Sequence, residues 1–474
     1  MTPSTVQAPA FTYLRRSIQG SVVTPEDDGF DEARLAWHLG VDQRPAAVVY
    51  PETPADIATV VRYARAAGLR VAPQGTGHNA PPLGDLGSSI LLKTSRMRGV
   101  QIDPTRERAR AEAGVLWHEV VEPAAAYGLA ALHGSSPDVG VVGYSLGGGV
   151  GWQVRLRGLA TNSVTAAELV TADGELIRVD ADHEPELFWA LRGGGGNFGI
   201  VTALEFELFP LETVYAGWLI WPWEQAETVL GRWSEWVGTM PDEMTSVGRI
   251  LQLPPLPFIP EPLRGRKLVV VEAAYIGTEG SGATRLEPLR ALEPEIDTVT
   301  TMPAAGLARL HQDPENPSFA LVEHALLAEL PKSGVDAFLS AAGPGSGSQI
   351  LSAEIRHLGG AAGVPAPGGG ALSHIQAEFL TAAIALPMSP EMAVTLEHQL
   401  ASYADAMAPY SSGRSYLNFT EGKTDTGSFY SADTYARLRA LRAQVDPTGL
   451  FQANHEIPTA VEATSNASPL ALAA

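Results

Sequence analysis

The first fifth of the chain alternates apolar runs with one amphipathic helical pattern. Residues 47–51 (AVVYP) and 69–73 (LRVAP) favour two short strands. Between them, the segment 53–68 places apolar residues on one helical face and ends at a glycine, a common helix stop: Ile57, Val60, Val61, Ala64 and Gly68. Strand, helix and strand in this order predict an α+β unit.

The alternation continues to about residue 212. Strands are expected at 90–92, 108–113 and 200–208, and helices at 117–127 and 185–192. The segment 164–180 predicts a hairpin, because its centre carries Asp173-Gly174. Three glycine-rich stretches interrupt the pattern and are expected as loops, at 74–79, 134–151 and 193–199.

The pattern changes after Pro210. The segment 213–260 holds five of the nine tryptophans and a proline cluster at 254–257. Residues 343–370 are low in complexity and predict loops around a strand at 350–358. A helix is expected at 432–445, and the small polar tail beyond Pro458 is expected to be disordered.

Composition narrows the possible functions. Of 474 residues, 53 are acidic and 32 basic, a net charge of −21 that argues against nucleic-acid binding and against docking on anionic membranes. There are no cysteines, so disulfides, thiolate metal sites and cysteine nucleophiles are excluded, and no metal site is predicted. No signal-peptide or membrane-spanning run is found, which makes a cytoplasmic location the default expectation.

Each glycine stretch has more than one interpretation. In 74–79 (QGTGHN), glycines allow backbone N–H groups to approach a phosphate, but a plain turn fits as well. The stretch 143–147 (GYSLG) matches the nucleophile elbow of serine hydrolases at Ser145, although the glycines that follow make a poor helix start. The stretch 194–199 spells a dinucleotide fingerprint, yet a helix precedes it and a strand follows, which reverses the required order.

Taken in order, these three stretches and a C-terminal YLNF motif (416–419) resemble covalent FAD oxidases of the vanillyl-alcohol oxidase fold. Within that PCMH-type superfamily, the similarity is to the berberine-bridge-enzyme-like branch. It covers about 40–212 and 413–458. The resemblance implies FAD held on backbone amides, with its 8α carbon bonded to the histidine of the first loop, here His78.

A second covalent bond is not expected. Many relatives attach FAD also through a cysteine, at the position that is Ser136 here. The resemblance therefore implies a single covalent bond at His78. It also implies the cofactor-binding residues Gln74, Gly75, Thr76, Gly77, His78, Asn79, Ser136, Pro137, Asp138, Gly140, Gly143, Tyr144, Gly147, Gly148, Gly149, Gly199, Ile200, Val201, Tyr416 and Asn418.

The catalytic base is harder to assign than the residue that bonds to FAD. Relatives often use the last tyrosine of a Tyr-x-Asn-Tyr motif, which is Phe419 here and cannot accept a proton. On the strand 350–358, period-two geometry places Glu354 and Arg356 on one face. If this strand covers the flavin as in relatives, Glu354 is a candidate base and Arg356 a candidate partner for an anionic substrate; a surface ion pair is the alternative. Tyr144 corresponds to a residue near the flavin N1–C2=O edge, where a donor would stabilise negative charge.

The resemblance implies an α+β protein with an FAD domain formed by 1–212 and 413–474 and an α+β substrate domain at 213–412. The expected reaction moves hydride from a small organic substrate to FAD, and O2 then reoxidises the flavin with formation of H2O2, in a role in secondary metabolism. An oxygenating enzyme of natural-product biosynthesis is the alternative within the family, and a serine hydrolase at Ser145 is a remote one. The substrate and the oligomeric state do not follow from the sequence.

Overall fold

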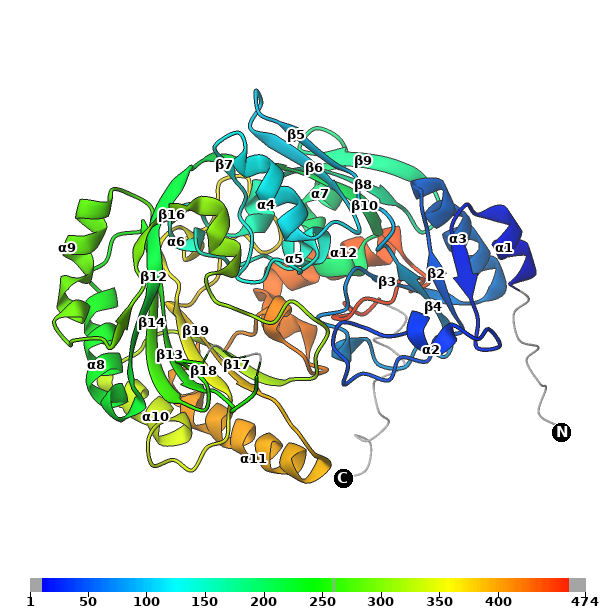
Figure 1. Ribbon diagram of the computed structural model, residues 1–474. Helices are drawn as coiled ribbons and strands as arrows, with labels where there is room; N and C mark the ends of the chain where they lie inside the picture. Colours follow the sequence, from blue (N-terminus) through cyan, green and yellow to red (C-terminus); the bar gives the residue numbers. More distant parts are fainter. Residues whose placement is uncertain (1–10, 258, 260, 460–474) are drawn as a thin grey trace, which may run out of the picture.

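The computed structural model describes residues 11–257, 259 and 261–459, so most of the tail expected to be disordered lies outside the described residues. Figure 1 shows two lobes side by side, one formed mainly by residues before about 212 and one by a large sheet from residues 213–385. The α+β class expected from the sequence is confirmed. Within the described residues, no helix combines the length and apolar character needed to cross a bilayer.

The first lobe begins with a four-stranded sheet in the order β1-β2-β4-β3. The strands β2, β4 and β3 are parallel, and the helix α3 connects β2 to β3. The bounds are β1 Ser21–Val23, β2 Ala47–Tyr50, α3 Pro54–Ala67, β3 Arg70–Gln74 and β4 Ser89–Lys93, with short helices α1 Thr12–Ser17 and α2 Phe30–Ala33 alongside. The apolar face expected of α3 is fully buried, and Gly68 ends the helix at φ 68°. This packing fixes the position where β3 delivers the first glycine loop.

A five-stranded antiparallel sheet completes the first lobe, in the order β5-β6-β10-β8-β9. Its strands are β5 Val100–Asp103, β6 Arg108–Glu112, β8 Val164–Val170, β9 Leu176–Asp180 and β10 Ile200–Glu207, and the pairing of β8 with β9 confirms the expected hairpin. The helices α4 Trp117–Ala125 and α7 Pro185–Leu191 agree closely with the expected ones. Because α7 precedes 193–199 and β10 follows it, the reversed order that excluded a dinucleotide fingerprint is confirmed.

The expectation of a loop throughout 134–151 was wrong at one place. Residues Val141–Leu146 form the helix α5, which includes Gly143 and Tyr144. Its apolar residues Val141, Val142 and Leu146 are buried in the core of the lobe. Tertiary burial therefore outweighs the low helical propensity of glycine and valine. Gly148 and Gly149 then adopt positive φ angles of 113° and 83°, which prevents the helix from continuing.

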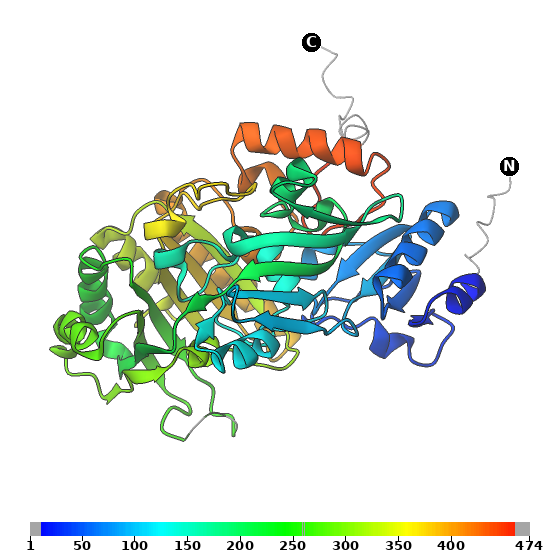
Figure 2. The ribbon, with the colours of Figure 1, turned by 90° about the horizontal axis from the view of Figure 1, so that it is seen from above.

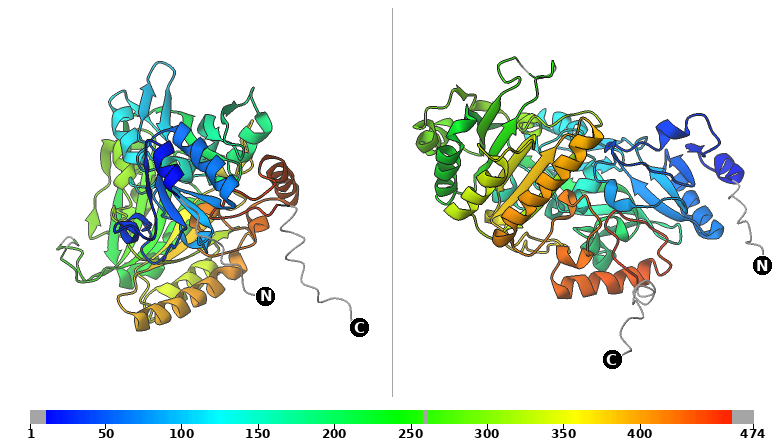
Figure 3. Two further views of the ribbon diagram at one scale, coloured as in Figure 1. Left: turned by 90° about the vertical axis from the view of Figure 1, so that its right-hand side faces the viewer. Right: turned by 90° about the horizontal axis from the view of Figure 1, so that it is seen from below.

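The second lobe is a sheet in the order β15-β12-β14-β13-β18-β19-β17, with β16 beside β12. Its bounds are β12 Thr213–Pro222, β13 Met244–Gln252, β14 Lys267–Tyr275, β15 Ile296–Asp297, β16 Thr300–Pro303, β17 Leu321–Leu327, β18 Ser352–His357 and β19 Phe379–Ala385. One face packs on the helices α8 Ala226–Val237, α9 Glu279–Arg290, α10 Lys332–Ala342 and α11 Pro390–Met407. Figure 3 shows these helices on the outer side of the sheet. The other face is turned to the first lobe, where Trp152 and Ala130 join its apolar cluster.

The C-terminal segment returns to the first lobe. The helix α12 Ala432–Val445, drawn in orange in Figure 2, packs on this lobe. It contacts α7, and its Arg437 pairs with Glu186 of that helix. Further along, the backbone of Val71 in β3 bonds with Leu450 and Gln452. We retain 1–212, 213–412 and 413–474 as proposed domain limits, since the chain crosses between the lobes near them.

Candidate active site

The loop after β3 holds His78 in a defined orientation. The carbonyl oxygens of Thr76 and Gly77 accept hydrogen bonds from the backbone N–H groups of Trp37 and His38, at 3.0 and 3.3 Å. The imidazole of His78 stacks on the Trp37 indole, with ring centroids 4.0 Å apart. Its Nδ1 lies 2.7 Å from Thr76 Oγ1, whereas its buried Nε2 has no hydrogen-bond partner. Gly77 has a φ of 85°, which favours glycine at this turn.

A second stretch, 136–140, lies next to this loop. Asp138 accepts hydrogen bonds from Trp37 Nε1 at 2.6 Å and from Ser136 Oγ at 2.8 Å, and its Oδ1 is 3.6 Å from His78 Nε2. Burial raises the pKa of Asp138, but the contacts with His78, Ser136 and Trp37 outweigh it and keep that pKa below its usual value. The carbonyl oxygen of Pro137 accepts a hydrogen bond from the backbone N–H of His118, which ties this stretch to α4. The first and second glycine stretches therefore meet at His78.

Tyr144 on α5 places a phenol inside the first lobe. Its hydroxyl is buried without a hydrogen-bond partner, and its ring contacts the Trp117 ring edge-on at 5.5 Å. Burial raises the pKa of Tyr144 well above its usual value, so the phenol stays protonated. A Cβ on Gly149 would collide with this ring, which explains glycine there.

The C-terminal motif is joined to α5 by hydrogen bonds. Asn418 Nδ2 donates to the carbonyl of Tyr144 at 3.0 Å, and the Gly149 N–H donates to the buried Tyr416 hydroxyl at 2.8 Å. A Cβ on Gly147 would collide with the Asn418 side chain. Asn79 Nδ2 donates to the Leu417 carbonyl at 3.1 Å, which ties the first loop to the same motif. We call the combined segments 74–79, 136–149 and 416–418 the glycine cradle.

The third glycine stretch ends at the start of β10. Gly199 has a φ of 149°, and Ile200 pairs with Val170 of β8. Ile200 and Val201 are buried, and a Cβ on Gly199 would collide with Leu169. Their proposed contact with FAD would therefore come from backbone atoms rather than side chains.

The cradle residues fit an FAD cofactor. A Cβ on Gly143 would meet no other atom within 4 Å, and Cβ atoms on Gly75 and Gly140 would have nearest neighbours at 3.9 and 3.8 Å. Backbone at these positions is thus open to close approach by a ligand, as phosphate-binding loops require. The unpartnered His78 Nε2, Asn79 Oδ1 and Tyr144 hydroxyl add polar atoms of the kind that a flavin nucleotide can use.

The sheet of the second lobe carries a group of largely buried charges that face the first lobe. We define the charge cluster as Arg249, Glu272, His311, Glu354 and Arg356. His311 bridges the two carboxylates, with Nδ1 2.5 Å from Glu272 Oε2 and Nε2 2.9 Å from Glu354 Oε2. Arg249 donates to Glu272 at 2.8 Å, and Arg356 donates to Glu354 at 2.7 Å. Both carboxylates and His311 are fully buried, so Glu354 and Arg356 form no surface ion pair.

The pKa values in the cluster follow from this pairing. Burial and Arg249 lower the pKa of His311, but Glu272, Asp313 and Glu354 outweigh them and raise it to about 9. Burial raises the pKa of Glu354, yet Arg356, His311 and Arg249 hold it far below its usual value. A carboxylate so stabilised in its ionised form is a weak proton acceptor. The assignment of Glu354 as the base stays a prediction, and this pairing weighs against it.

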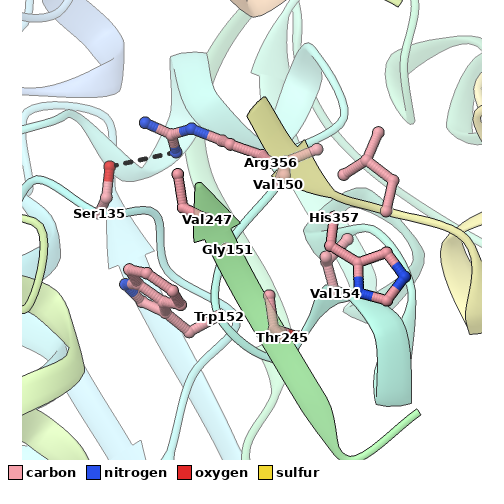
Figure 4. A pocket seen from close by; sticks show the side chains of 10 residues that line it. Ser135, Val150, Gly151, Trp152, Val154, Thr245, Val247, Arg356 and His357 are labelled. Atoms are coloured by element: carbon pink, nitrogen blue, oxygen red, sulfur yellow. Dashed lines mark hydrogen bonds between the residues drawn. The ribbon is translucent and has the colours of Figure 1, made fainter. Parts of the chain in front are cut away.

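A pocket lies where the two lobes meet. Its walls come from residues on either side of the cradle segment 136–149, from β13 and from the end of β18: Ser135, Val150, Gly151, Trp152, Val154, Thr245, Val247, Arg356, His357 and Leu358. Figure 4 shows the Arg356 guanidinium turned toward Ser135, with Trp152 and Val247 beside it. The same guanidinium lies 5.3 Å from the ring of Phe419. Arg356 thus connects the charge cluster to Ser135 and Phe419, which directly flank two segments of the cradle.

Several residues of the site do not belong to any sequence motif. Arg249, Glu272, His311 and Trp37 were not identified from the sequence. Glu272 did leave a signal, since it is the one carboxylate in the apolar strand Lys267–Tyr275. The serine-hydrolase alternative also loses support, because Ser145 lies inside α5, is 2% exposed and does not follow a strand directly.

Comparisons with known proteins agree with this geometry. The profile of the FAD binding domain family matches residues 45–180, and that of the berberine and berberine-like family matches 415–458. The chain is 31% identical to (R)-6-hydroxynicotine oxidase of Paenarthrobacter nicotinovorans, over 93% of this chain and 97% of the relative. The crystal structure of 6-hydroxy-D-nicotine oxidase from Arthrobacter nicotinovorans superposes with a TM-score of 0.80 at 29% identity, covering 95% of this chain and all of that one.

A second relative matches only part of the chain. Glucooligosaccharide oxidase of Sarocladium strictum is 33% identical over 46% of this chain and 45% of its own length. The full-length match with the hydroxynicotine oxidase, the two family profiles and the cradle all identify an FAD-linked oxidase. The chain belongs to the berberine-bridge-enzyme-like FAD-linked oxidases of the PCMH-type superfamily.

Proposed function

We propose that this enzyme carries FAD bonded covalently to His78 alone and oxidises a small organic substrate, with O2 as the electron acceptor and H2O2 as the product. The observation that carries the proposal is the position of His78. His78 lies where the first two glycine stretches meet. Its ring is held by stacking on Trp37, and its Nε2 has no hydrogen-bond partner. The chain has no cysteine that could provide a second bond. When bound, FAD accepts a hydride from the substrate and passes two electrons to O2.

Each protein group has a distinct task in this proposal. The backbone of 75–79, 140–149 and 199–201 holds the cofactor, and Asn418 fixes α5 by its bond to the Tyr144 carbonyl. Tyr144 supplies a neutral O–H donor that has no other hydrogen-bond partner, where charge develops during reduction. Phe419 offers an apolar surface beside Arg356.

Arg356 is the proposed contact for an electronegative group of the substrate. Its guanidinium lines the pocket between the lobes, together with the apolar Trp152 and Val247. Glu354 holds Arg356 by a 2.7 Å hydrogen bond and remains ionised, so we assign it to orienting Arg356 rather than to accepting a proton. This arrangement suits a compact, partly apolar substrate with an oxygen or carboxylate group.

The extent of the match with the two relatives favours a small substrate. The hydroxynicotine oxidase, named for a small molecule, matches along nearly the whole chain, whereas the oligosaccharide oxidase matches over less than half of it. A role in secondary metabolism is consistent with a small-molecule substrate and remains part of the proposal.

The reaction can be tested by an anaerobic screen. Alcohols, amines, phenols and small sugars would be mixed with the enzyme while flavin absorbance near 450 nm is followed. The expected result is bleaching by a small substrate and, in air, one H2O2 per substrate oxidised. No bleaching by any small compound, with reduction by oligosaccharides only, would contradict the substrate size. Labelled oxygen in the organic product would instead indicate the oxygenating chemistry.

A further inference from the structure

A histidine of the second lobe lies beside Phe419, which cannot accept a proton. His324 is on β17, and strand alternation places it on the same face as Leu326, which packs in the core of the first lobe. The ring centroids of His324 and Phe419 are 6.3 Å apart. The Arg356 guanidinium lies 5.3 Å from the same Phe419 ring. His324 and Arg356 therefore both border Phe419.

A cross-strand row connects His324 with the charge cluster. His324 pairs with Ala382 of β19, and Ala382 pairs with Glu354 of β18. Because adjacent strands are about 4.8 Å apart, the backbone positions of His324 and Glu354 are about 10 Å apart on one face of the sheet. Only the methyl group of Ala382 stands between them in this row. A compact substrate bound at Arg356 can therefore extend across Ala382 to His324.

The contacts of His324 leave one ring nitrogen open. The Thr420 hydroxyl donates its proton to the Tyr416 carbonyl at 2.9 Å, so its oxygen, 3.3 Å from His324 Nε2, accepts the Nε2–H. The Tyr416 backbone N–H is 3.5 Å from the same nitrogen, at the limit for a hydrogen bond. Among the described residues, none forms a hydrogen bond with His324 Nδ1. In this tautomer Nδ1 carries the lone pair and can take up a proton.

The surroundings of His324 keep its ring neutral. Burial and the nearby His455 lower the pKa of His324 to about 4, so the ring is uncharged near pH 7, as a proton acceptor must be. Burial also lowers the pKa of His455 to about 4 and raises the pKa of the Tyr416 phenol, whereas Arg356 stays charged. Glu323, whose pKa is raised by burial, precedes His324 and by strand alternation points to the helix-covered face of the sheet.

Resting on the proposed oxidation of a small substrate, we propose that His324 is the proton acceptor of that reaction, with Nδ1 as the accepting atom. The substrate class is a compound with an O–H or N–H group on the carbon that is oxidised. The hydrogen of the C–H bond leaves with its electron pair as hydride and passes to FAD, the O–H or N–H proton passes to Nδ1, and a C=O or C=N bond forms. When O2 takes up the two electrons, the hydride hydrogen and this proton complete H2O2, and His324 returns to its neutral form.

The experiment follows flavin reduction and histidine modification in the holoenzyme. Wild type, His324→Gln, the double variant that adds Phe419→Tyr, and His398→Gln are mixed anaerobically with the compound that bleaches the wild-type flavin fastest in the anaerobic screen. His398 is an exposed histidine on α11 and gives the matched control. The rate constant of reduction is recorded from about pH 6 to about pH 8. In parallel, wild-type holoenzyme is treated with diethyl pyrocarbonate, which acylates neutral histidines, and the labelled residues are located by peptide mass.

We expect His324→Gln to slow reduction about 100-fold near pH 7 and to make the rate rise about tenfold per pH unit, because hydroxide then removes the proton. Wild type and His398→Gln should show a level profile. Adding Phe419→Tyr should recover about tenfold in rate, because a phenol beside Arg356 can accept the proton. Diethyl pyrocarbonate should label His324 but not His133, which is 4% exposed.

A level pH profile in His324→Gln would show that this residue only packs against its neighbours, and the inference would be overturned. A His324 that stays unlabelled would overturn it as well, because a substrate could not reach Nδ1 either. In both cases the bleaching of the wild-type flavin would leave the proposed function standing. Failure of every compound of the screen to bleach the wild-type flavin would overturn the proposed function and, with it, this inference.

Discussion

The glycine cradle and the charge cluster differ in whether their polar groups have partners within the protein. The cradle works through backbone groups and leaves polar atoms such as His78 Nε2 and the Tyr144 hydroxyl without partners. In the charge cluster, Glu272 and Glu354 are fully buried and each contacts at least two cations. Polar atoms without a protein partner are available to a ligand, whereas buried ion pairs mainly fix the orientation of their own side chains. The comparison assigns binding to the cradle and orientation of Arg356 to the cluster.

The largest expected effect follows from breaking the cluster. Glu354→Leu would leave the fully buried His311 and the largely buried Arg356 without their shared carboxylate. Removing one partner of a buried pair costs about 3–5 kcal/mol, because the other charge stays desolvated. Urea unfolding should show this loss in the free energy of unfolding.

A matched control for that loss is Asp336→Asn, which breaks the exposed pair with Lys332 and should leave the urea midpoint unchanged. If both variants changed the free energy of unfolding by the same small amount, the ion pairs of the cluster would not stabilise the fold.

Tyr144→Phe should separate catalysis from stability. The lost hydroxyl has no protein partner, so the free energy of unfolding should not fall. Without a donor for developing charge, flavin reduction should slow about 100-fold. Rapid-mixing absorbance measures the reduction step directly. A large loss of stability with unchanged reduction would mean that Tyr144 is only a packing residue.

The pH dependence of stability should report the cluster through His311. Its pKa of about 9 in the folded protein exceeds the usual 6.5. Protonated His311 therefore stabilises the fold fully below about pH 6.5, and this contribution is lost as the pH rises through 9. The melting temperature of wild type should fall between pH 7 and 10, and that of His311→Gln should fall less. Parallel curves for the two proteins would contradict a charged His311.

The smallest expected effect concerns a single methyl group in the cradle. Gly143 is inside α5, and a Cβ there would meet no atom within 4 Å. In protein that has not bound FAD, Gly143→Ala should raise the free energy of unfolding by about 0.5–1 kcal/mol, as alanine does inside helices. It should at the same time lower the FAD content of purified protein, because the methyl group fills space proposed for the cofactor. Unchanged flavin content would remove α5 from the binding surface.

The sequence was most informative where local patterns set the structure. Helix α3, the hairpin of β8 and β9 and helix α12 follow from short-range periodicity and turn residues. Helix α5 was missed because burial of Val141 and Leu146 overrides the preference of the glycines around them. The cradle was recognised because close backbone contacts and positive φ angles require glycine at several of its positions. Glycines at such fixed positions form a motif that is visible in the sequence.

The charge cluster was largely hidden from sequence reasoning. Its members come from β13, β14, β18 and the loop at His311, and pairing between distant strands brings them together. Only Glu354 and Arg356, two residues apart on one strand, could be linked by periodicity. Trp37 likewise reaches His78 through tertiary contacts alone.

The most direct test of the account is acid precipitation of the purified wild-type protein. The account predicts a yellow pellet whose flavin fluorescence migrates with the 474-residue chain on a denaturing gel, and a pellet from His78→Ala that is colourless. A colourless wild-type pellet with FAD in the supernatant, or a yellow pellet from His78→Ala, would contradict the covalent anchor at His78.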